Sequence, residues 1–298
     1  VTAAASSRLV IPPRLAIATA ALIFSTGGAA IKYAAFSPWQ VASFRSGLAA
    51  LTLLILAPRL GLRITSRSAL VGLAYAATLV GFVLANRLTT GANAIYLQST
   101  APFFVLLLGP FILGERMRRS DFPVIVAVLV GLVLVLSAGN APSSSAPNPR
   151  LGNILALGTG LTYALMICGL RWLNHDGGIP GESVGAVALG NIFAFAAALP
   201  MALPVGIHPA SDWLLLGYLG VIQIALAYLL VDYGLKRVPA LDASLLLLVE
   251  TALNPVWTWL LMGEIPATAA IAGGAAIIAA TVLQSINAAR NRPALESA

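Results

Sequence analysis

Apolar segments of about 20 residues recur along the whole chain, and they constrain the fold more than any other feature. A helix of about this length spans the hydrocarbon core of a bilayer, since each residue adds about 1.5 Å along the axis. We expect ten such spans, at residues 14–34, 38–58, 68–88, 93–113, 121–138, 151–171, 183–203, 213–235, 240–262 and 266–287. With 59% hydrophobic and 9% charged residues, the chain is predicted to be an all-α integral membrane protein.

The positions of Lys and Arg indicate how the spans are oriented. If the amino terminus is cytoplasmic, most basic residues fall on the cytoplasmic side: Arg8, Arg14, Arg59, Arg63, Arg67, Arg116, Arg118, Arg119, Arg171, Lys236, Arg237, Arg290 and Arg292. Only Lys32, Arg87 and Arg150 fall on the other side. This bias predicts a multi-pass protein of a bacterial inner membrane with both termini in the cytoplasm. The net charge of +7 then reflects topology and attraction to the lipid bilayer, and no nucleic-acid partner is expected.

A polar stretch divides the ten spans into two groups of five. Residues 140–150 read NAPSSSAPNPR, and their prolines and serines are typical of a linker. We therefore divide the chain into a first five-helix repeat at 1–139, the linker at 140–150 and a second five-helix repeat at 151–298. Because five is an odd number, homologous halves must cross the membrane in opposite directions.

The ends of the fourth and ninth spans support a duplication. The fourth span ends in Gly114-Glu115 and the ninth in Gly263-Glu264, and a shift of 149 residues superposes the two pairs. Inverted repeats of this kind are typical of secondary transporters, whose halves exchange roles to open one side and then the other. The sequence therefore favours transport over a soluble catalytic or binding function.

The chain resembles the EamA-type drug/metabolite transporter superfamily, and within it most resembles the bacterial YddG-type aromatic amino acid exporters. The resemblance covers the whole chain and rests on ten spans and on the proline-bearing span that runs into a Gly-Glu pair in each half. It implies two inverted five-helix repeats around a central cavity. One position departs from the family pattern: relatives commonly carry proline directly after the glutamate of the ninth span, where this chain has Thr251.

Candidate site residues lie on one face of the ninth span. Glu250 is near its middle, and Asn254 and Trp257 follow four and seven residues later, which places all three on one helix face. A charge at this depth is costly, so Glu250 should face protein or a water-filled cavity. Pro255 lacks an amide hydrogen, and we expect the helix to bend or open there. Gln98 falls on the corresponding face of the fourth span.

Three tyrosines extend this candidate site. Tyr75 and Tyr228 fall one helical turn apart when the halves are superposed, and Tyr163 has Phe24 as its counterpart. Their rings could stack on a substrate, or their hydroxyls could bind a carboxylate. The predicted substrate-binding residues are Tyr75, Gln98, Tyr163, Tyr228, Glu250, Asn254 and Trp257. The alternative is structural: the tyrosines fill helix interfaces, the amides join helices, and Glu250 is a buried neutral carboxyl.

The other charges near the spans are predicted to be structural. Arg45 lies close to the outer end of the second span, and we expect it to reach that interface or to cap a neighbouring helix. Glu115 and Glu264 are expected to mark helix ends, and Asp232 to pair with Lys236 one turn later.

These features predict a secondary transporter that exports a small metabolite by alternating access, with no enzymatic activity. The resemblance favours amino acids, aromatic ones above all, and export of other metabolites or drugs is the alternative. A membrane enzyme is less favoured, because His175 and His208 fall in loops on opposite sides and Cys168 stands alone, so no catalytic or metal site is expected. A channel is also less favoured, because a channel would need a ring of charges or a filter-like stretch, and neither appears in the sequence. No Walker A pattern is present and no cofactor is expected, and a monomer could form the complete unit.

Overall fold

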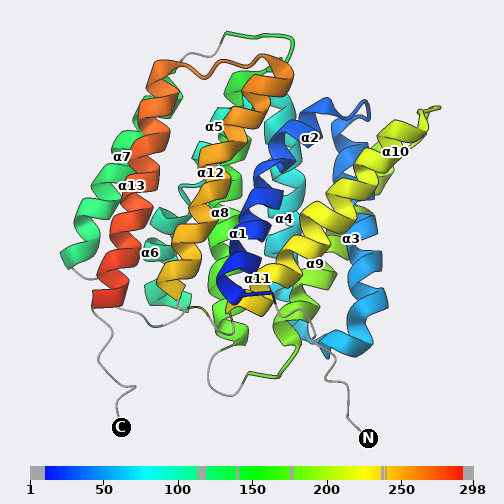
Figure 1. Cartoon of the computed structure of the whole chain (residues 1–298), viewed down its shortest axis with the longest axis horizontal. Helices are drawn as coiled ribbons and strands as arrows, with labels where there is room; N and C mark the ends of the chain where they lie inside the picture. The colour runs from blue at the N-terminus through cyan, green and yellow to red at the C-terminus, as the bar shows by residue number, and fades with distance from the viewer. Residues whose placement is uncertain are drawn as a thin grey trace, which may run out of the picture.

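The computed structural model describes residues 11–112, 114, 119–138, 141–174, 178–235, 238 and 240–290, without the side chains of residues 120, 232, 235, 240–245, 285 and 287–290. All regular elements in this part of the chain are helical (Figure 1). In chain order they are α1 (Pro13–Ser25), α2 (Gly27–Tyr33), α3 (Pro38–Leu60), α4 (Ser66–Leu88), α5 (Gly91–Gln98), α6 (Ala101–Ile112), η1 (Arg119–Asp121), α7 (Phe122–Ser137), α8 (Pro149–Leu173), α9 (Glu182–Ala202), α10 (Ala210–Gly217), η2 (Tyr218–Leu226), α11 (Ala227–Leu235), α12 (Ala240–Met262) and α13 (Thr268–Arg290).

Many of these helices are long and apolar enough to cross a bilayer. Among the described residues, seven segments meet both criteria: Pro13–Tyr33, Pro38–Leu60, Ser66–Leu88, Gly91–Ile112, Pro149–Leu173, Glu182–Ala202 and Ala210–Val231. Three shorter apolar helices, at Phe122–Ser137, Leu246–Met262 and Thr268–Gln284, coincide with the fifth, ninth and tenth expected spans. The protein is therefore an all-helical, multi-span membrane protein, while a total of ten spans stays a prediction.

Three expected spans contain interruptions that hydropathy does not indicate. The first changes direction at Thr26 between α1 and α2, and the fourth is interrupted between Gln98 and Ala101. The eighth contains the π-helix η2 between α10 and α11, whose wider turns are often found at functional sites. By contrast, α12 continues through Pro255, so the opening expected there is not found. Packing of α1 and α2 along α12 supports an unbroken helix around this proline.

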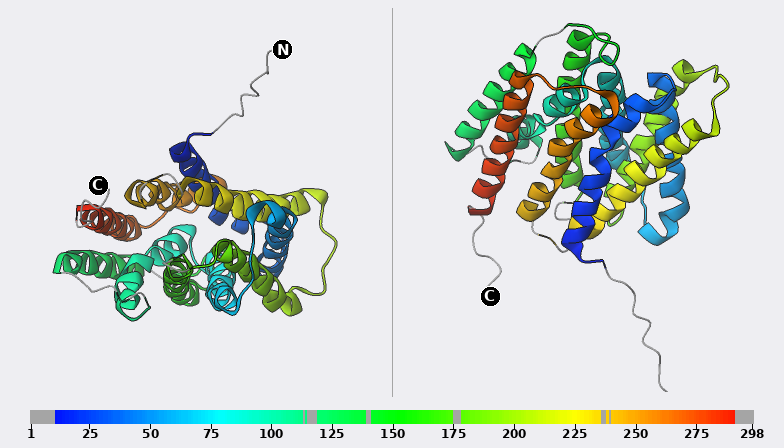
Figure 2. Two further views of the ribbon diagram at one scale, coloured as in Figure 1. Left: turned by 90° about the horizontal axis from the view of Figure 1, so that it is seen from below. Right: turned by 45° about the horizontal axis from the view of Figure 1, so that its top comes forward.

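Helices of the two halves pack in matching pairs. α3 packs against α9, and α7 packs against α13. The packing of α4 on α8 corresponds to that of α11 on α1, and the packing of α5 and α6 on α8 corresponds to that of α12 on α1. Seen from below in Figure 2, α1, α11 and α12 form one row and α4, α8 and α9 another. Exchanging the halves preserves these pairs of neighbours, as a duplicated fold requires.

The helices approach closely where small residues meet. A β-carbon at Gly131 of α7 would lie 2.7 Å from the Gly273 carbonyl oxygen of α13, and one at Gly273 would lie 2.5 Å from the Gly131 oxygen. Association of helices in lipid depends on such close packing, because lipid tails are as apolar as the side chains. These glycines therefore fix the backbone contact between the last helices of the two halves.

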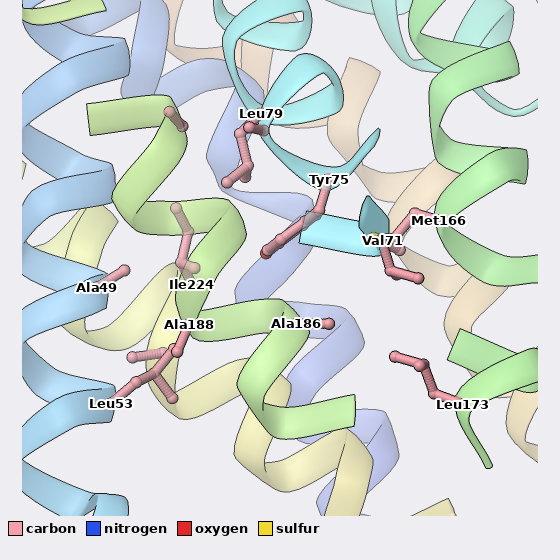
Figure 3. Packing of buried hydrophobic residues seen from close by; sticks show 13 residues of the cluster. Ala49, Leu53, Val71, Tyr75, Leu79, Met166, Leu173, Ala186, Ala188 and Ile224 are labelled. Atoms are coloured by element: carbon pink, nitrogen blue, oxygen red, sulfur yellow. The ribbon is translucent and has the colours of Figure 1, made fainter. Parts of the chain in front are cut away.

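A hydrophobic cluster fills the middle of the bundle and positions the candidate site. Its buried members include Leu53, Tyr75, Leu79, Met166 and Ile224, which come from both halves (Figure 3). Tyr163 and Tyr228 pack against it and are only partly buried. Two of the predicted tyrosines therefore lie at the edge of this core.

Candidate functional site

The three predicted tyrosines lie close together inside the bundle. The ring centroids of Tyr75 in α4 and Tyr228 in α11 are 5.4 Å apart, with an edge-to-face geometry. Phe24 of α1 contacts the Tyr228 ring at 5.1 Å, and Tyr163 of α8 packs against the same hydrophobic cluster. The Tyr75 hydroxyl lies near Tyr228 and Asn191, although no hydrogen bond of acceptable geometry reaches it. Both halves thus contribute to one aromatic group.

Glu250 lies beside these tyrosines. It is the eleventh of the 23 residues of α12, so it lies about 15 Å from the start of the helix. Tyr163 and Tyr228 are close enough to interact with it electrostatically. Glu250 is embedded in protein and yet partly accessible, and no hydrogen bond or ion pair joins it to another described residue. A deeply placed carboxyl without a protein partner can be accommodated where water or a ligand reaches it.

Arg45 lies next to the same tyrosines, and sequence reasoning did not include it in the site. Its side chain is only 2% exposed, and its Nη2 donates a hydrogen bond of 2.9 Å to the Leu79 carbonyl of α4. Tyr75 and Tyr228 lie within electrostatic range. The expectation that Arg45 reaches the interface or caps a helix is therefore wrong, since Leu79 is inside α4. Position in the span indicates depth, but only the packing of α3 on α9 and η2 fixes the direction of the side chain.

Asn254 and Trp257 face α1 and α2. Asn254 is fully buried, and a β-carbon at Gly28 would lie 2.5 Å from its Oδ1. Neither polar atom of the Asn254 carboxamide has a hydrogen-bond partner, and Trp257 donates a 2.9 Å hydrogen bond to Ser25 Oγ. Gln98, at the end of α5, likewise has an unpaired buried Oε1.

The junction between α1 and α2 collects further polar groups that were not predicted. Thr26 Oγ1 lies 2.6 Å from the Tyr218 hydroxyl of η2. The Gln223 carboxamide of η2 packs against Gly27, where a β-carbon would lie 2.5 Å from its Nε2. A signal in the sequence could have revealed this junction, because residues 25–28 read STGG within an apolar span.

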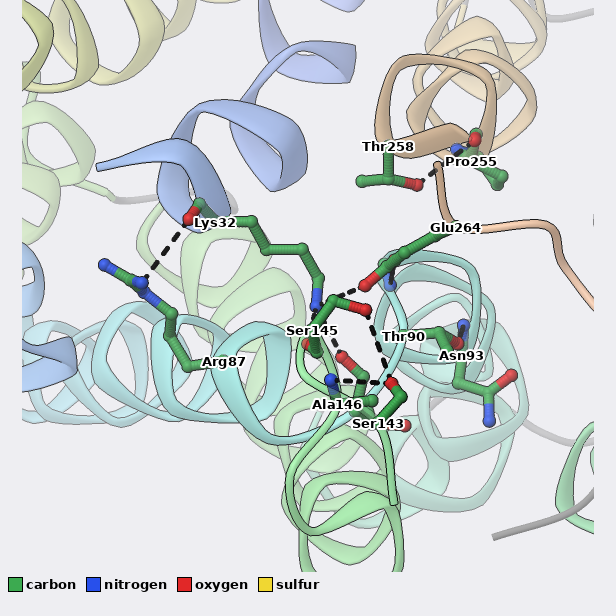
Figure 4. A network of polar contacts seen from close by, with 12 residues as sticks. Lys32, Arg87, Thr90, Asn93, Ser143, Ser145, Ala146, Pro255, Thr258 and Glu264 are labelled. Carbon is green, nitrogen blue, oxygen red and sulfur yellow. Dashed lines mark hydrogen bonds and ion pairs between the residues drawn. The ribbon is translucent and has the colours of Figure 1, made fainter. Parts of the chain in front are cut away.

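One end of the bundle is closed by a network of charged and polar groups (Figure 4). Lys32 Nζ lies 2.8 Å from Glu264 Oε1 and donates hydrogen bonds to the carbonyls of Thr89 and Ser145, at 2.8 and 2.6 Å. Glu264 Oε2 also accepts a 2.8 Å hydrogen bond from the Gly91 amide. Glu264 therefore joins the halves as well as following a helix end.

Some predictions fall outside the described residues. Glu115, Lys236 and the Asp232 side chain belong to these, so the matching Gly-Glu end and the expected ion pair stay predictions. In the part of the chain that the structure describes, no three His, Cys, Asp or Glu residues gather in a group able to hold a metal ion.

Comparison with known proteins assigns this architecture to a family. A model of the EamA-like transporter family matches the chain twice, at residues 13–137 and 150–286. The chain belongs to the EamA-like transporter family. It is thus a membrane transporter and not an enzyme, and its two matched segments fit the paired packing of its helices.

Several known proteins are similar to this chain over most of their length. The pseudopaline exporter CntI of Pseudomonas aeruginosa is 24% identical over 274 residues, which cover 89% of this chain and 93% of the relative. An uncharacterized transporter of Archaeoglobus fulgidus is 28% identical over 220 residues, covering 69% of this chain and 75% of the relative. A solved crystal structure with 21% sequence identity has a TM-score of 0.63 and covers 94% of this chain and 99% of that chain. This EamA-like transporter therefore has a known fold.

Proposed function

We propose that this EamA-like transporter exports small metabolites, namely amino acids, aromatic ones above all and other neutral ones as well, across a bacterial inner membrane by alternating access. One observation carries the proposal: Glu250 lies deep in the bundle, partly accessible and without an ion-pair partner among the described residues, in electrostatic range of tyrosines from both halves. The name of the similar pseudopaline exporter supports export of a metabolite. A transporter needs sparse polar groups of this kind, because a substrate must bind at mid-depth and leave again.

Each site residue has a proposed role. The rings of Tyr75, Tyr163 and Tyr228 form the wall against an apolar or aromatic side chain. Glu250 either binds the substrate ammonium group or carries a proton through the cycle. The remaining proposed residues are Asn254 and Trp257, which face α2 and α1, and Gln98 at the end of α5.

Alternating access uses the two repeats, which we place at residues 1–139 and 151–298 with opposite orientations and with both termini in the cytoplasm. In this topology the ion pair between Lys32 and Glu264 lies at the outer end of the bundle. Release of substrate to the outside then requires this contact to open.

Uptake by proteoliposomes tests the proposal. Radiolabelled Phe, Trp, Leu and Thr are offered to purified wild type and to Glu250→Gln, with and without a pH gradient. We expect wild type to take up the aromatic substrates. If Glu250 carries a proton, the variant loses the response to the gradient but still exchanges bound substrate; if Glu250 binds the ammonium group, affinity falls at every pH.

A matched control removes a carboxylate elsewhere. Asp212 lies in the first turn of α10, at the opposite end of the eighth span from Tyr228 in α11, so Asp212→Asn should behave like wild type in the same assay. Failure of wild type to move any of the four amino acids shifts the substrate to other metabolites or drugs. If the wild type also takes up no member of a broad panel of metabolites, the result contradicts the proposed export function.

A further inference from the structure

We propose that Arg45 binds a carboxylate of the transported substrate, in the same site as Tyr228 and Glu250. This inference rests on the proposed function and extends it by naming a chemical group that the substrate must carry. It uses a residue outside the predicted binding set.

The first observation is an uncompensated charge. Arg45 is 2% exposed, and within the described part of the chain it has no carboxylate within ion-pair distance. A guanidinium has five N–H donors, yet among the described residues Arg45 makes a single hydrogen bond, from Nη2 to the Leu79 carbonyl, and its Nε is buried without a partner there. A buried charge is costly unless a counter-charge or several hydrogen bonds stabilise it. The site is therefore incomplete in a way that an anion would correct.

A structural role accounts poorly for this arrangement. Leu79 lies in the interior of α4, where its carbonyl already accepts the amide of the residue one turn later. The helix does not need the guanidinium to satisfy this carbonyl. Two cations at the ends of helices do find several partners: Arg87 donates to the carbonyls of Lys32, Ala34 and Phe36, and Lys32 pairs with Glu264. Arg45 is the less well-satisfied group.

The surroundings of Arg45 match an amino acid. Tyr228 lies within electrostatic range of both Arg45 and Glu250, whereas Arg45 and Glu250 do not form an ion pair with each other. A positive and a negative group thus both lie near Tyr228, whose ring contacts those of Tyr75 and Phe24 edge to face. A substrate with a carboxylate, an ammonium group and an apolar or aromatic side chain complements all three features. Arg suits the carboxylate end because its planar fork can donate two parallel hydrogen bonds.

The first test needs no mutation. Uptake of radiolabelled L-phenylalanine by wild-type proteoliposomes is competed with unlabelled phenylalanine, with phenylalanine amide, and with phenethylamine, which lack the carboxylate but keep the ring and the amine. We expect both analogues to compete on the order of 10-fold to 100-fold less well, because a lost charge-assisted hydrogen bond costs about this much. Equal competition by the amide overturns the inference.

The second test changes Arg45. In Arg45→Gln the preference for phenylalanine over its amide should fall to about threefold or less, and Arg45→Lys, which keeps the charge but loses the planar fork, should lie in between. Arg87→Gln is the matched control, because Arg87 is at the end of α4 and its loss should leave the preference unchanged. Monodisperse elution establishes folding of each variant. If Arg45→Gln does not fold, the inference is tested by the preference for phenylalanine over its amide in Arg45→Lys and in the wild type.

The outcomes separate this inference from the function on which it rests. Transport of amino acids with no preference for the free carboxylate, or a preference that persists in a folded Arg45→Gln, overturns the role of Arg45 and leaves transport intact. Transport confined to compounds without a carboxylate overturns the role of Arg45 together with the proposed amino acid substrate, and leaves only the assignment as a transporter. A wild-type protein that moves no member of a panel with and without carboxylates overturns both proposals.

Discussion

Lys32 and Glu264 belong to different halves of the chain, and their side chains meet at 2.8 Å with only 4% and 5% of their surfaces exposed. A pair buried to this extent depends on both partners, because the loss of one leaves the other charge without compensation. Glu264 also accepts the Gly91 amide at the start of α5, so the pair joins three helix ends.

Breaking this pair on one side should destabilise the protein strongly. We expect Glu264→Gln or Lys32→Met each to lower the free energy of unfolding by about 3–5 kcal/mol, and the double variant to cost clearly less than the sum. Thermal unfolding of the purified variants in detergent measures this. Strictly additive losses would show that the two side chains do not interact.

The contact between Gly28 and Asn254 should not tolerate a larger residue. A β-carbon at Gly28 would meet the Asn254 Oδ1 at 2.5 Å, and the fully buried carboxamide has little room to move. Gly28→Ala should therefore cost about 1–3 kcal/mol of stability, and Asn254→Ala should relieve much of this loss. Gly158→Ala in α8 is the control: nothing lies within 4 Å of its β-carbon, and Ala favours the helix. A Gly28 variant as stable as the control would contradict the observed packing.

The backbone contact between α7 and α13 predicts a different response. At Gly131 and Gly273 the atoms that a new methyl group would meet include carbonyl oxygens of the facing helix. Because a helix backbone cannot move aside like a side chain, Gly131→Ala should cost at least about 1–3 kcal/mol, with no rescue by trimming a neighbouring side chain. Gly109→Ala, with open space around its β-carbon, should be tolerated. Melting temperatures of the three variants test this order.

Glu182 should matter for its acceptor oxygen rather than for its charge. It is fully buried at the start of α9, where it accepts a hydrogen bond from Thr65 Oγ1, while Arg67 Nη1 is as far as 3.8 Å away. Glu182→Gln keeps an acceptor and should cost about 1 kcal/mol or less, whereas Glu182→Ala leaves the Thr65 hydroxyl unpaired and should cost about 1–3 kcal/mol. If Glu182→Gln and Glu182→Ala lower the free energy of unfolding equally, the effect comes from the loss of the charge.

The sequence predicted the features of this fold that depend on hydrophobicity along the chain. Long apolar segments, a polar linker and the repeated Gly-Glu pair predicted a helical membrane protein with related halves, and the family match at 13–137 and 150–286 fits these expectations. The depth of Glu250 could also be predicted, because counting residues from a span end gives depth directly.

Features that depend on the direction of a side chain could not be predicted. Arg45 was expected at the interface and instead lies beside Tyr75 and Tyr228, because helix packing decides which face of α3 is turned inward. The pair of Lys32 with Glu264 joins residues far apart in the chain. Pro255 was expected to open α12, which stays continuous.

The pairing of α3 with α9, α4 with α8, and α7 with α13 has a consequence for biosynthesis. The ribosome completes α3, α4 and α7 before any of these partners exists. Until then Gly131 and the Arg45 guanidinium must be accommodated by lipid, water or the insertion machinery. The first half of the newly made chain can therefore form only its internal contacts, such as that of α3 with α4, and the contacts between the halves form after translation reaches the second half.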